Sequence, residues 1–187
     1  AAAGFAQAQS ATYSVDPTHT FVTFEALHFG TSTIRGRFDR KEGTVQFDRA
    51  GKSGKAQIAI DMTSVSTGVG PLDGHLKSKD FFDAAANPSA TFVADKFVFD
   101  GDKVTEVVGS LTLLGKSNPV TLKASNFNCY QNPMLKREVC GADAAGAFKL
   151  KGLPPGRYVL KVFNQEAWKD PGTGTPADAG ATNVRLR

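Results

Sequence analysis

The stretch that decides the fold class is Thr20-Phe-Val-Thr-Phe-Glu-Ala-Leu-His-Phe29. It is rich in β-branched and aromatic residues and is followed by a glycine, which is typical of a β-strand. Because successive side chains of a strand point to opposite faces, one face carries Val22, Phe24, Ala26 and His28. That face is apolar up to its last residue, so we expect it to line a core or a cavity.

The same alternation of polar and apolar residues recurs along most of the chain. Turn residues separate the alternating runs, as at Gly51-Lys-Ser-Gly54 and at Asp100-Gly101. The strands predicted on this basis are 32–38, 43–48, 55–61, 90–94, 96–99, 103–108, 109–114 and 119–123. In the first of these, Ile34 and Phe38 share a face. Strands at this spacing, without an internal repeat, predict one antiparallel sandwich or barrel.

One segment departs from the strand pattern. Residues 71–80 predict a single short helix, because a proline occupies its first turn and apolar residues are spaced along it. We expect Leu76, together with Phe81 and Phe82 just after the helix, to cap one end of a barrel. The predicted fold is therefore all-β with one helical insertion.

Composition and charge narrow the classes of function. The chain has 14 Phe against 3 Tyr and 1 Trp, and phenylalanine lines a dry core and a lipid pocket equally well. The 22 basic residues are set against 18 acidic ones, and the densest basic stretch, residues 35–42, contains its own acids. We therefore expect a solvated surface there and no nucleic-acid site. No run approaches the ~18 apolar residues of a membrane span.

Two cysteines, Cys129 and Cys140, lack the paired short spacings or adjacent histidines of a zinc site. We interpret them as a local disulfide, which implies an oxidising compartment. Residues 1–12 contain small-x-small steps of the kind found at signal-peptidase sites, without a basic or an apolar region before them. They are interpreted as the remnant of a signal peptide or as a flexible arm.

Catalytic equipment is not evident in the sequence. No G-x-S-x-G nucleophile motif and no phosphate-binding glycine loop is present. His19, His28 and His75 would have to converge with Asp16 or Asp73 to hold a metal, and they lack the short spacing of ligands on one element. We therefore expect no catalytic residue, no metal and no cofactor. His28 is either a polar group within an apolar pocket or a hydrogen-bonded core histidine.

Several segments in order resemble the YceI family of bacterial periplasmic proteins. The resemblance begins at Tyr13-Ser-Val-Asp-Pro-Thr-His19 and is most recognisable in Asp73-Gly-His75-Leu76-Lys-Ser-Lys-Asp80-Phe81-Phe82. Other matching segments are residues 34–38, 64–68, 88–92 and 109–122. The stretch 132–143 resembles a subset of members with two cysteines. Together these segments cover residues 13–148.

The resemblance implies a lipocalin-like antiparallel barrel of about eight strands, closed around a tunnel for an isoprenoid chain or a quinone tail. It also implies a periplasmic binding or carrier protein that is not an enzyme. On this basis we expect a ligand pocket lined by Val22, Phe24, Ala26, His28, Ile34, Phe38, Leu76, Phe81, Phe82, Phe92, Leu111 and Leu113.

The chain departs from the family pattern after Phe148, where residues 149–156 carry two prolines that do not fit a central strand. Residues 157–167 then resemble the family's last strand, and this altered region puts closure of the barrel in question. We expect a barrel domain over 13–168 and a flexible tail over 169–187.

Two other functions stay open at this point. One is a non-catalytic interaction scaffold that uses the cysteine loop as its recognition surface, and a homodimer is compatible with the sequence. The other is a metal-dependent hydrolase built on the three histidines.

Overall fold

The computed structural model describes residues 10–148 and 158–169. In chain order the elements are β1 (Ala11–Val15), β2 (Thr20–His28), β3 (Ser32–Phe38), β4 (Lys41–Asp48), β5 (Ser53–Asp61), the 3₁₀ helix η1 (Met62–Ser64), β6 (Val65–Ser66), α1 (Gly70–Lys77), β7 (Ser89–Asp100), β8 (Lys103–Leu113), β9 (Lys116–Asn132), β10 (Arg137–Phe148) and β11 (Tyr158–Lys169).

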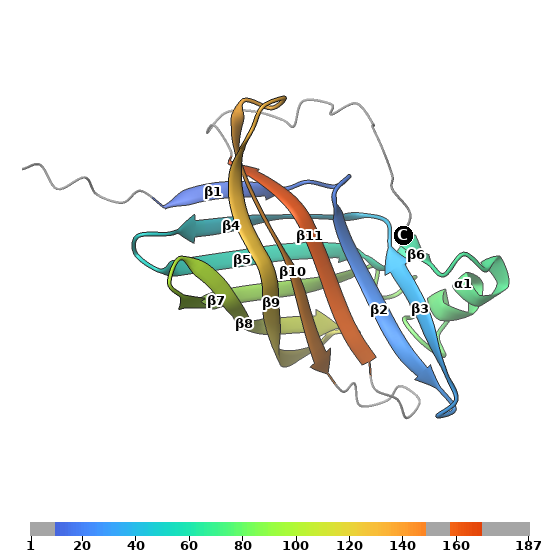
Figure 1. The fold of residues 1–187 in the computed structure, drawn as a ribbon. Coiled ribbons are helices and arrows are strands. Elements are labelled where there is room, and N and C mark those ends of the chain that lie inside the picture. Colours follow the sequence, from blue (N-terminus) through green and yellow to red (C-terminus); the bar gives the residue numbers. More distant parts are fainter. Residues whose placement is uncertain (1–9, 149–157, 170–187) are drawn as a thin grey trace, which may run out of the picture.

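All strands form one antiparallel sheet in the order β1-β4-β5-β7-β8-β9-β10-β11-β2-β3-β6. The ladder returns on itself because β1 pairs with β4 at Tyr13↔Val45 and with β11 at Val15↔Ala167. Figure 1 shows the sheet strongly curled, so that β9, β10, β11 and β2 cross in front of β4, β5, β7 and β8. The prediction of an all-β antiparallel barrel with one short helix is confirmed.

The question of closure is answered by β11. Its first part pairs with β10 and β2, and its last residues pair with β1, so the ladder is continuous through this strand. The proline-containing segment 149–156 lies outside the described residues, as do residues 1–9 and 170–187 of the expected arm and tail. β1 begins at Ala11, two residues before the expected start of the domain.

Inward-facing side chains form two apolar clusters. One cluster lies at the α1 end of the barrel and contains Phe24, Phe38 and Phe82, whose ring centroids are 5.6–5.9 Å apart. We call these three rings the aromatic plug, and the cluster that contains them the plug cluster. The other cluster, which includes Tyr13 and Phe47, lies near the cysteines. We call the end of the barrel that contains this cluster the disulfide end.

Several strands are longer than predicted. The runs 90–94 and 96–99 form one strand, β7, with a register irregularity between Ala94 and Lys96 that shifts the alternation. β9 continues to Asn132, and β10 was not predicted from the alternation at all. Asparagine and glutamine in late β9, and alanine and glycine in β10, have low intrinsic strand preference. Pairing with neighbouring strands on both sides overrides that preference.

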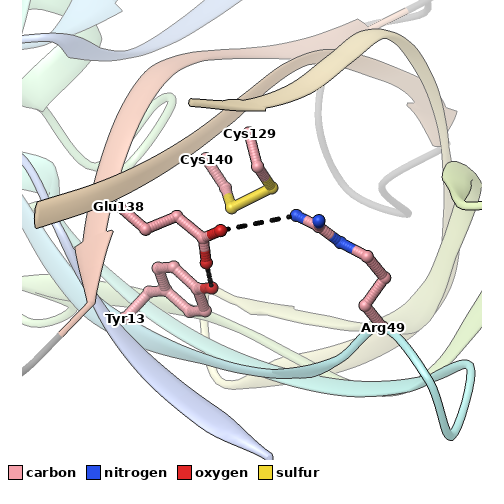
Figure 2. Close-up of a disulfide and its surroundings, with 5 residues drawn as sticks. All are labelled: Tyr13, Arg49, Cys129, Glu138 and Cys140. Atoms are coloured by element: carbon pink, nitrogen blue, oxygen red, sulfur yellow. Dashed lines mark hydrogen bonds and ion pairs between the residues drawn. A yellow bond between two sulfur atoms is a disulfide. The ribbon is translucent and has the colours of Figure 1, made fainter. Parts of the chain in front are cut away.

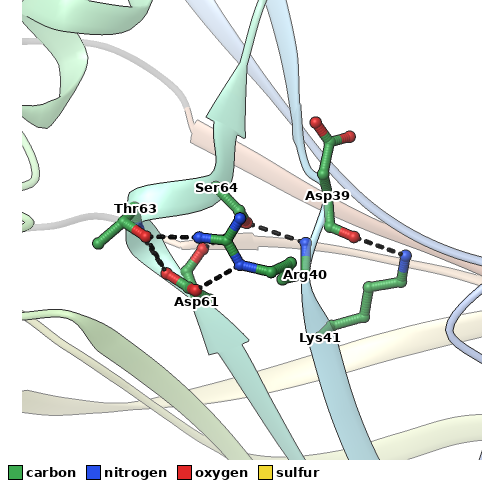
Figure 3. A network of polar contacts seen from close by, with 6 residues as sticks. All are labelled: Asp39, Arg40, Lys41, Asp61, Thr63 and Ser64. Atoms are coloured by element: carbon green, nitrogen blue, oxygen red, sulfur yellow. Dashed lines mark hydrogen bonds and ion pairs between the residues drawn. The ribbon is translucent and has the colours of Figure 1, made fainter.

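A polar network links the residue before β4 to the end of β5 and to η1 (Figure 3). The Arg40 guanidinium donates to Asp61 Oδ2 and to Thr63 Oγ1, both at 2.8 Å. The Arg40 backbone N–H donates to Ser64 Oγ at 2.9 Å. These bonds fix the start of β4 to the turn that leads into β6 and α1. The α1 helix, which matches the predicted helix within three residues, begins with Pro71 in its first turn and buries Leu76 against the plug cluster.

Candidate ligand-binding cavity

The barrel contains a partly open apolar cavity of about 140 Å³ between the aromatic plug and the disulfide end. Its described lining residues come from β1, β2, β4, β5, β7, β8, β9 and β10, and none of these carries a charged side chain. They are Tyr13, Val22, Val45, Phe47, Ala56, Ile58, Ile60, Phe92, Phe97, Val104, Val107, Leu122, Ala124, Phe127, Cys140, Gly141, Ala142 and Ala144. The lining thus has the make-up of a dry cavity for an apolar guest.

Small residues on one wall create this space. β10 contributes Gly141, Ala142 and Ala144, and its register partner on β9 contributes Ala124 opposite Ala144. Bulkier side chains at these positions would fill the interior, as phenylalanine does at the α1 end. The empty volume is therefore a consequence of the alanine and glycine content of β10.

One hydrogen-bonding side chain reaches this apolar lining. Tyr13 is 3% exposed, and its hydroxyl donates to Glu138 Oε1 at 2.6 Å. Glu138 Oε2 lies 3.7 Å from the Arg49 guanidinium, and Figure 2 shows the three side chains together beside the Cys129–Cys140 disulfide. Glu138 lies two residues before Cys140 on β10, and Arg49 lies in the turn between β4 and β5. Three separate parts of the sheet therefore meet at this polar end of the cavity.

The tyrosine is held in its neutral form. Burial raises the pKa of the Tyr13 hydroxyl well above its usual value, and the hydrogen bond to the Glu138 carboxylate raises it further. Arg49 opposes this shift more weakly. With its proton directed to Glu138, the phenol oxygen keeps its lone pairs available as acceptors.

The predicted disulfide is confirmed, with the sulfurs of Cys129 and Cys140 bonded across directly paired positions of β9 and β10. Cys140 is 8% exposed and lines the cavity. The bond therefore belongs to the cavity wall as well as to the sheet.

The predicted pocket residues fall into three groups. Val22 and Phe92 line the cavity. Most of the others lie in the plug cluster at the α1 end, either buried or packed against it: Phe24, Phe38, Leu76, Phe81, Phe82, Leu111 and Leu113. Ala26, His28 and Ile34 lie near the β2–β3 turn and do not line the cavity. The observed cavity lining therefore shares only Val22 and Phe92 with the predicted set. Contact of any of these residues with a ligand stays a prediction.

His28 is not inside the pocket as expected. In the described residues β11 begins at its pairing with Ala26, and the pairing recorded for β2 beyond that point is with β3. His28 is exposed there, with its ring 4.5 Å from that of Phe29. The alternation of the strand was predicted correctly, but the end of its neighbour could not be.

The three histidines lie in different surroundings. His19 Nδ1 is 2.5 Å from Asp16 Oδ2 at the turn before β2, and His75 packs against Phe81 after α1. Within residues 10–148 and 158–169 no group of three or more His, Cys, Asp or Glu side chains is placed to hold a metal ion. The convergence that the hydrolase hypothesis requires is therefore not seen in the described part of the chain.

Sequence analysis missed most of the wall. Alternation did place Val45 with Phe47 and Ile58 with Ile60 on shared faces, which was a usable signal. Tyr13 and the small residues of β10 carried no such signal, because an isolated tyrosine and an alanine-rich run do not identify a cavity.

A second hollow lies on the outer surface between β2, β3 and β6. It has a volume of about 480 Å³ and includes Glu25, Arg35, Arg37 and Thr67. Arg35 Nε donates to Glu25 Oε1 at 3.1 Å, so part of its charge is already paired. The polar lining of this groove distinguishes it from the apolar cavity of the barrel. In the described residues no helix is long and apolar enough to cross a bilayer.

Comparison with known proteins places this fold in a family. The family model of the YceI-like domain matches residues 13–153. Protein YceI of Escherichia coli O157:H7 is 37% identical over 147 residues, which cover 77% of this chain and 76% of that protein. The crystal structure of BcnA from Burkholderia cenocepacia covers 83% of this chain and 99% of its own, with a TM-score of 0.68 at 25% identity.

A more distant solved structure shares the fold. A domain from Saccharophagus degradans, described as polyisoprenoid-binding and implicated in plant cell wall breakdown, has a TM-score of 0.56 at 19% identity and covers 85% of this chain and 98% of its own. The family-model match and the identity to the Escherichia coli protein agree with the closed antiparallel barrel described above. The chain belongs to the YceI-like family.

Proposed function

We propose that this protein binds an isoprenoid lipid, either a polyprenyl chain or a quinone tail, and holds it in the barrel cavity as a carrier without transforming it. The observation that carries the proposal is the cavity itself, which lies within the curled sheet and whose described lining is apolar apart from Tyr13. The Saccharophagus domain described as polyisoprenoid-binding shares only the fold at its level of identity, so it adds a precedent and no residue.

The energetics favour a chain-like apolar guest. Burying apolar carbon yields roughly 0.8 kcal/mol per methylene, so one five-carbon isoprene unit contributes about 4 kcal/mol at most. The cavity of about 140 Å³ is close to the size of engineered apolar cavities that bind benzene, so it accommodates about one such unit. A longer chain requires the side chains of Phe47, Phe97 and Phe127, which line the cavity, to change rotamer.

An oxidising compartment fits this role. The Cys129–Cys140 disulfide persists in secreted and periplasmic proteins and is rare in the bacterial cytoplasm. We therefore place the carrier in the periplasm, where a shielded cavity would keep an isoprenoid out of water. An enzymatic role is not supported by the cavity, whose described lining offers neither a nucleophile nor an acid–base pair.

The test is direct. The protein is exported to the periplasm of a bacterial host, purified without detergent, extracted with organic solvent and analysed by mass spectrometry. We expect an isoprenoid lipid in near-stoichiometric amount and, after delipidation, recovery of binding to added geranylgeraniol measured by native mass spectrometry. A lipid-free extract together with no binding of added geranylgeraniol would refute the proposal.

A further inference from the structure

We propose that the Tyr13–Glu138–Arg49 group is the head-group site of the cavity, and that it selects an uncharged head group with an O–H to donate, such as a prenol or a quinol. This inference rests on the proposed lipid binding and extends it to the orientation and chemistry of the ligand. The polar head lies at the disulfide end and the tail points toward the aromatic plug.

The orientation follows from where polarity is found along the cavity. Among its described lining residues, Tyr13 is the one whose side chain forms ordinary hydrogen bonds; the others are apolar, glycine or the disulfide-bonded Cys140. At the opposite end, Phe24, Phe38 and Phe82 pack edge-to-face or tilted and offer no partner to a hydroxyl or carbonyl. A buried polar head without a partner is destabilised by about 1–3 kcal/mol, so it is placed at Tyr13.

The chemistry of the head group follows from which atoms are already engaged. The Tyr13 proton is directed to Glu138 Oε1, and Arg49 lies nearest to the other carboxylate oxygen. What the group presents to the cavity is therefore the lone pairs of the phenol oxygen, which accept a hydrogen bond and cannot donate one without breaking the bond to Glu138. A hydroxyl on the ligand satisfies this acceptor, and a carbonyl does not.

Charge argues against an anionic head group. The Glu138 carboxylate lies within one hydrogen bond of the phenol oxygen, whereas Arg49 is farther away and its side chain is 46% exposed to solvent. A diphosphate at this place would have to approach a carboxylate in a partly desolvated setting, where like charges repel more strongly than in water. Figure 2 shows the Arg49 side chain extending toward Glu138 from the opposite side of the view.

The experiment compares three ligands with the same C20 chain: geranylgeraniol, geranylgeranyl diphosphate and the corresponding hydrocarbon. Binding to the delipidated protein is measured by native mass spectrometry and isothermal titration calorimetry. We expect the alcohol to bind about fivefold more tightly than the hydrocarbon, the increment of one ordinary hydrogen bond, and at least tenfold more tightly than the diphosphate.

Two variants separate the roles of the group. Tyr13→Phe keeps the ring and removes the acceptor, so the ratio of alcohol affinity to hydrocarbon affinity should fall from about five toward one. Glu138→Gln removes the charge, so the penalty on the diphosphate should shrink more than alcohol binding changes. Tyr130→Phe is the matched control, because Tyr130 lies on β9, is 39% exposed and does not line the cavity.

The outcomes distinguish this inference from the proposed function. If wild-type protein binds none of the three ligands, lipid binding itself is refuted, and the head-group site with it. If the hydrocarbon and alcohol bind equally, or the diphosphate binds as tightly as the alcohol, only the head-group site is overturned. The head-group site alone is also overturned if Tyr13→Phe and Tyr130→Phe show the same ratio of alcohol affinity to hydrocarbon affinity. Because hydrocarbon binding reports an intact cavity, a misfolded variant is recognised by its loss.

Discussion

Filling the cavity from its alanine wall separates ligand binding from folding. Ala144 on β10 lines the cavity and packs against the plug cluster, so leucine at this position would project three additional carbons into the empty space. Neighbouring Ala147 on the same strand is exposed and does not line the cavity. The pair Ala144→Leu and Ala147→Leu therefore makes the same chemical change on two faces of one strand.

The magnitude follows from the volume and the number of carbons. Three buried carbons contribute at most about 2.4 kcal/mol to folding, at roughly 0.8 kcal/mol each, and imperfect fit reduces this by about 1–3 kcal/mol. The free energy of unfolding of ligand-free Ala144→Leu should thus lie between about 0.6 kcal/mol below and about 1.4 kcal/mol above its wild-type value. The ligand loses the burial of a similar number of carbons, which weakens binding by about ten- to fiftyfold.

Two assays are needed. Urea unfolding of delipidated protein gives the free energy of unfolding, and titration calorimetry with geranylgeraniol gives the affinity. Ala147→Leu should leave both quantities close to wild type. Unchanged affinity in Ala144→Leu would place the lipid outside this cavity. A loss of stability of more than about 2 kcal/mol would show that the space is not empty when the ligand is absent.

Three further predictions concern stability. Burial alone would raise the pKa of Asp16, but hydrogen bonds from Thr18 and His19 keep this pKa below its usual value of 3.8. The ionised Asp16 carboxylate therefore stabilises the fold above pH 3.8, and this stabilisation is lost as the pH falls through the lowered pKa. Asp16→Asn should therefore lower the free energy of unfolding by about 2 kcal/mol at pH 7 and flatten its decline in acid; parallel acid curves for the two proteins would contradict this. Replacing both cysteines by alanine releases a loop of sequence separation 11 and should cost about 3 kcal/mol in urea unfolding, and an unchanged midpoint would exclude the constraint. Gly109→Ala should lower the free energy of unfolding by more than about 2 kcal/mol, because the new Cβ would lie 2.4 Å from the Val93 carbonyl oxygen. Gly70→Ala is the control, because a Cβ at that position would have no heavy atom within 4 Å. Equal thermal midpoints for the two variants would refute the clash.

What could be predicted from sequence was the apolar face of the strands that alternate regularly, and what could not was the neighbouring strand on each side. Ser32–Phe38 was predicted to the residue, because alternation and flanking turns fix a hairpin strand locally. The apolar face of β2 was also predicted correctly, but His28 at its end is exposed and is not among the described lining residues of the cavity. Where a face stops being covered depends on where β11 begins, and that strand lies more than 130 residues away in the chain.

The polar end of the cavity could not be predicted from local sequence patterns either, because its residues are far apart in the chain. Tyr13 and Glu138 are separated by 125 residues, and nothing in either neighbourhood indicates that one hydroxyl meets one carboxylate. Only closure of the sheet, with β1 held between β4 and β11, brings them together beside the disulfide. The cysteines were predictable as a bond because the two lie close in sequence.

The abundance of phenylalanine, which composition left ambiguous between core and pocket, serves both purposes at different places in the barrel. Phe24, Phe38 and Phe82 pack mutually and close the α1 end, whereas Phe47 and Phe127, with centroids 5.4 Å apart, border empty space. Phe47 also contacts Tyr13 and Phe99, so we expect Phe127 to change rotamer with less loss of packing than Phe47 or the rings of the plug. In the proposed carrier, chain length would therefore be selected by how far the rings that border the cavity move, and the head group by Tyr13 at the disulfide end.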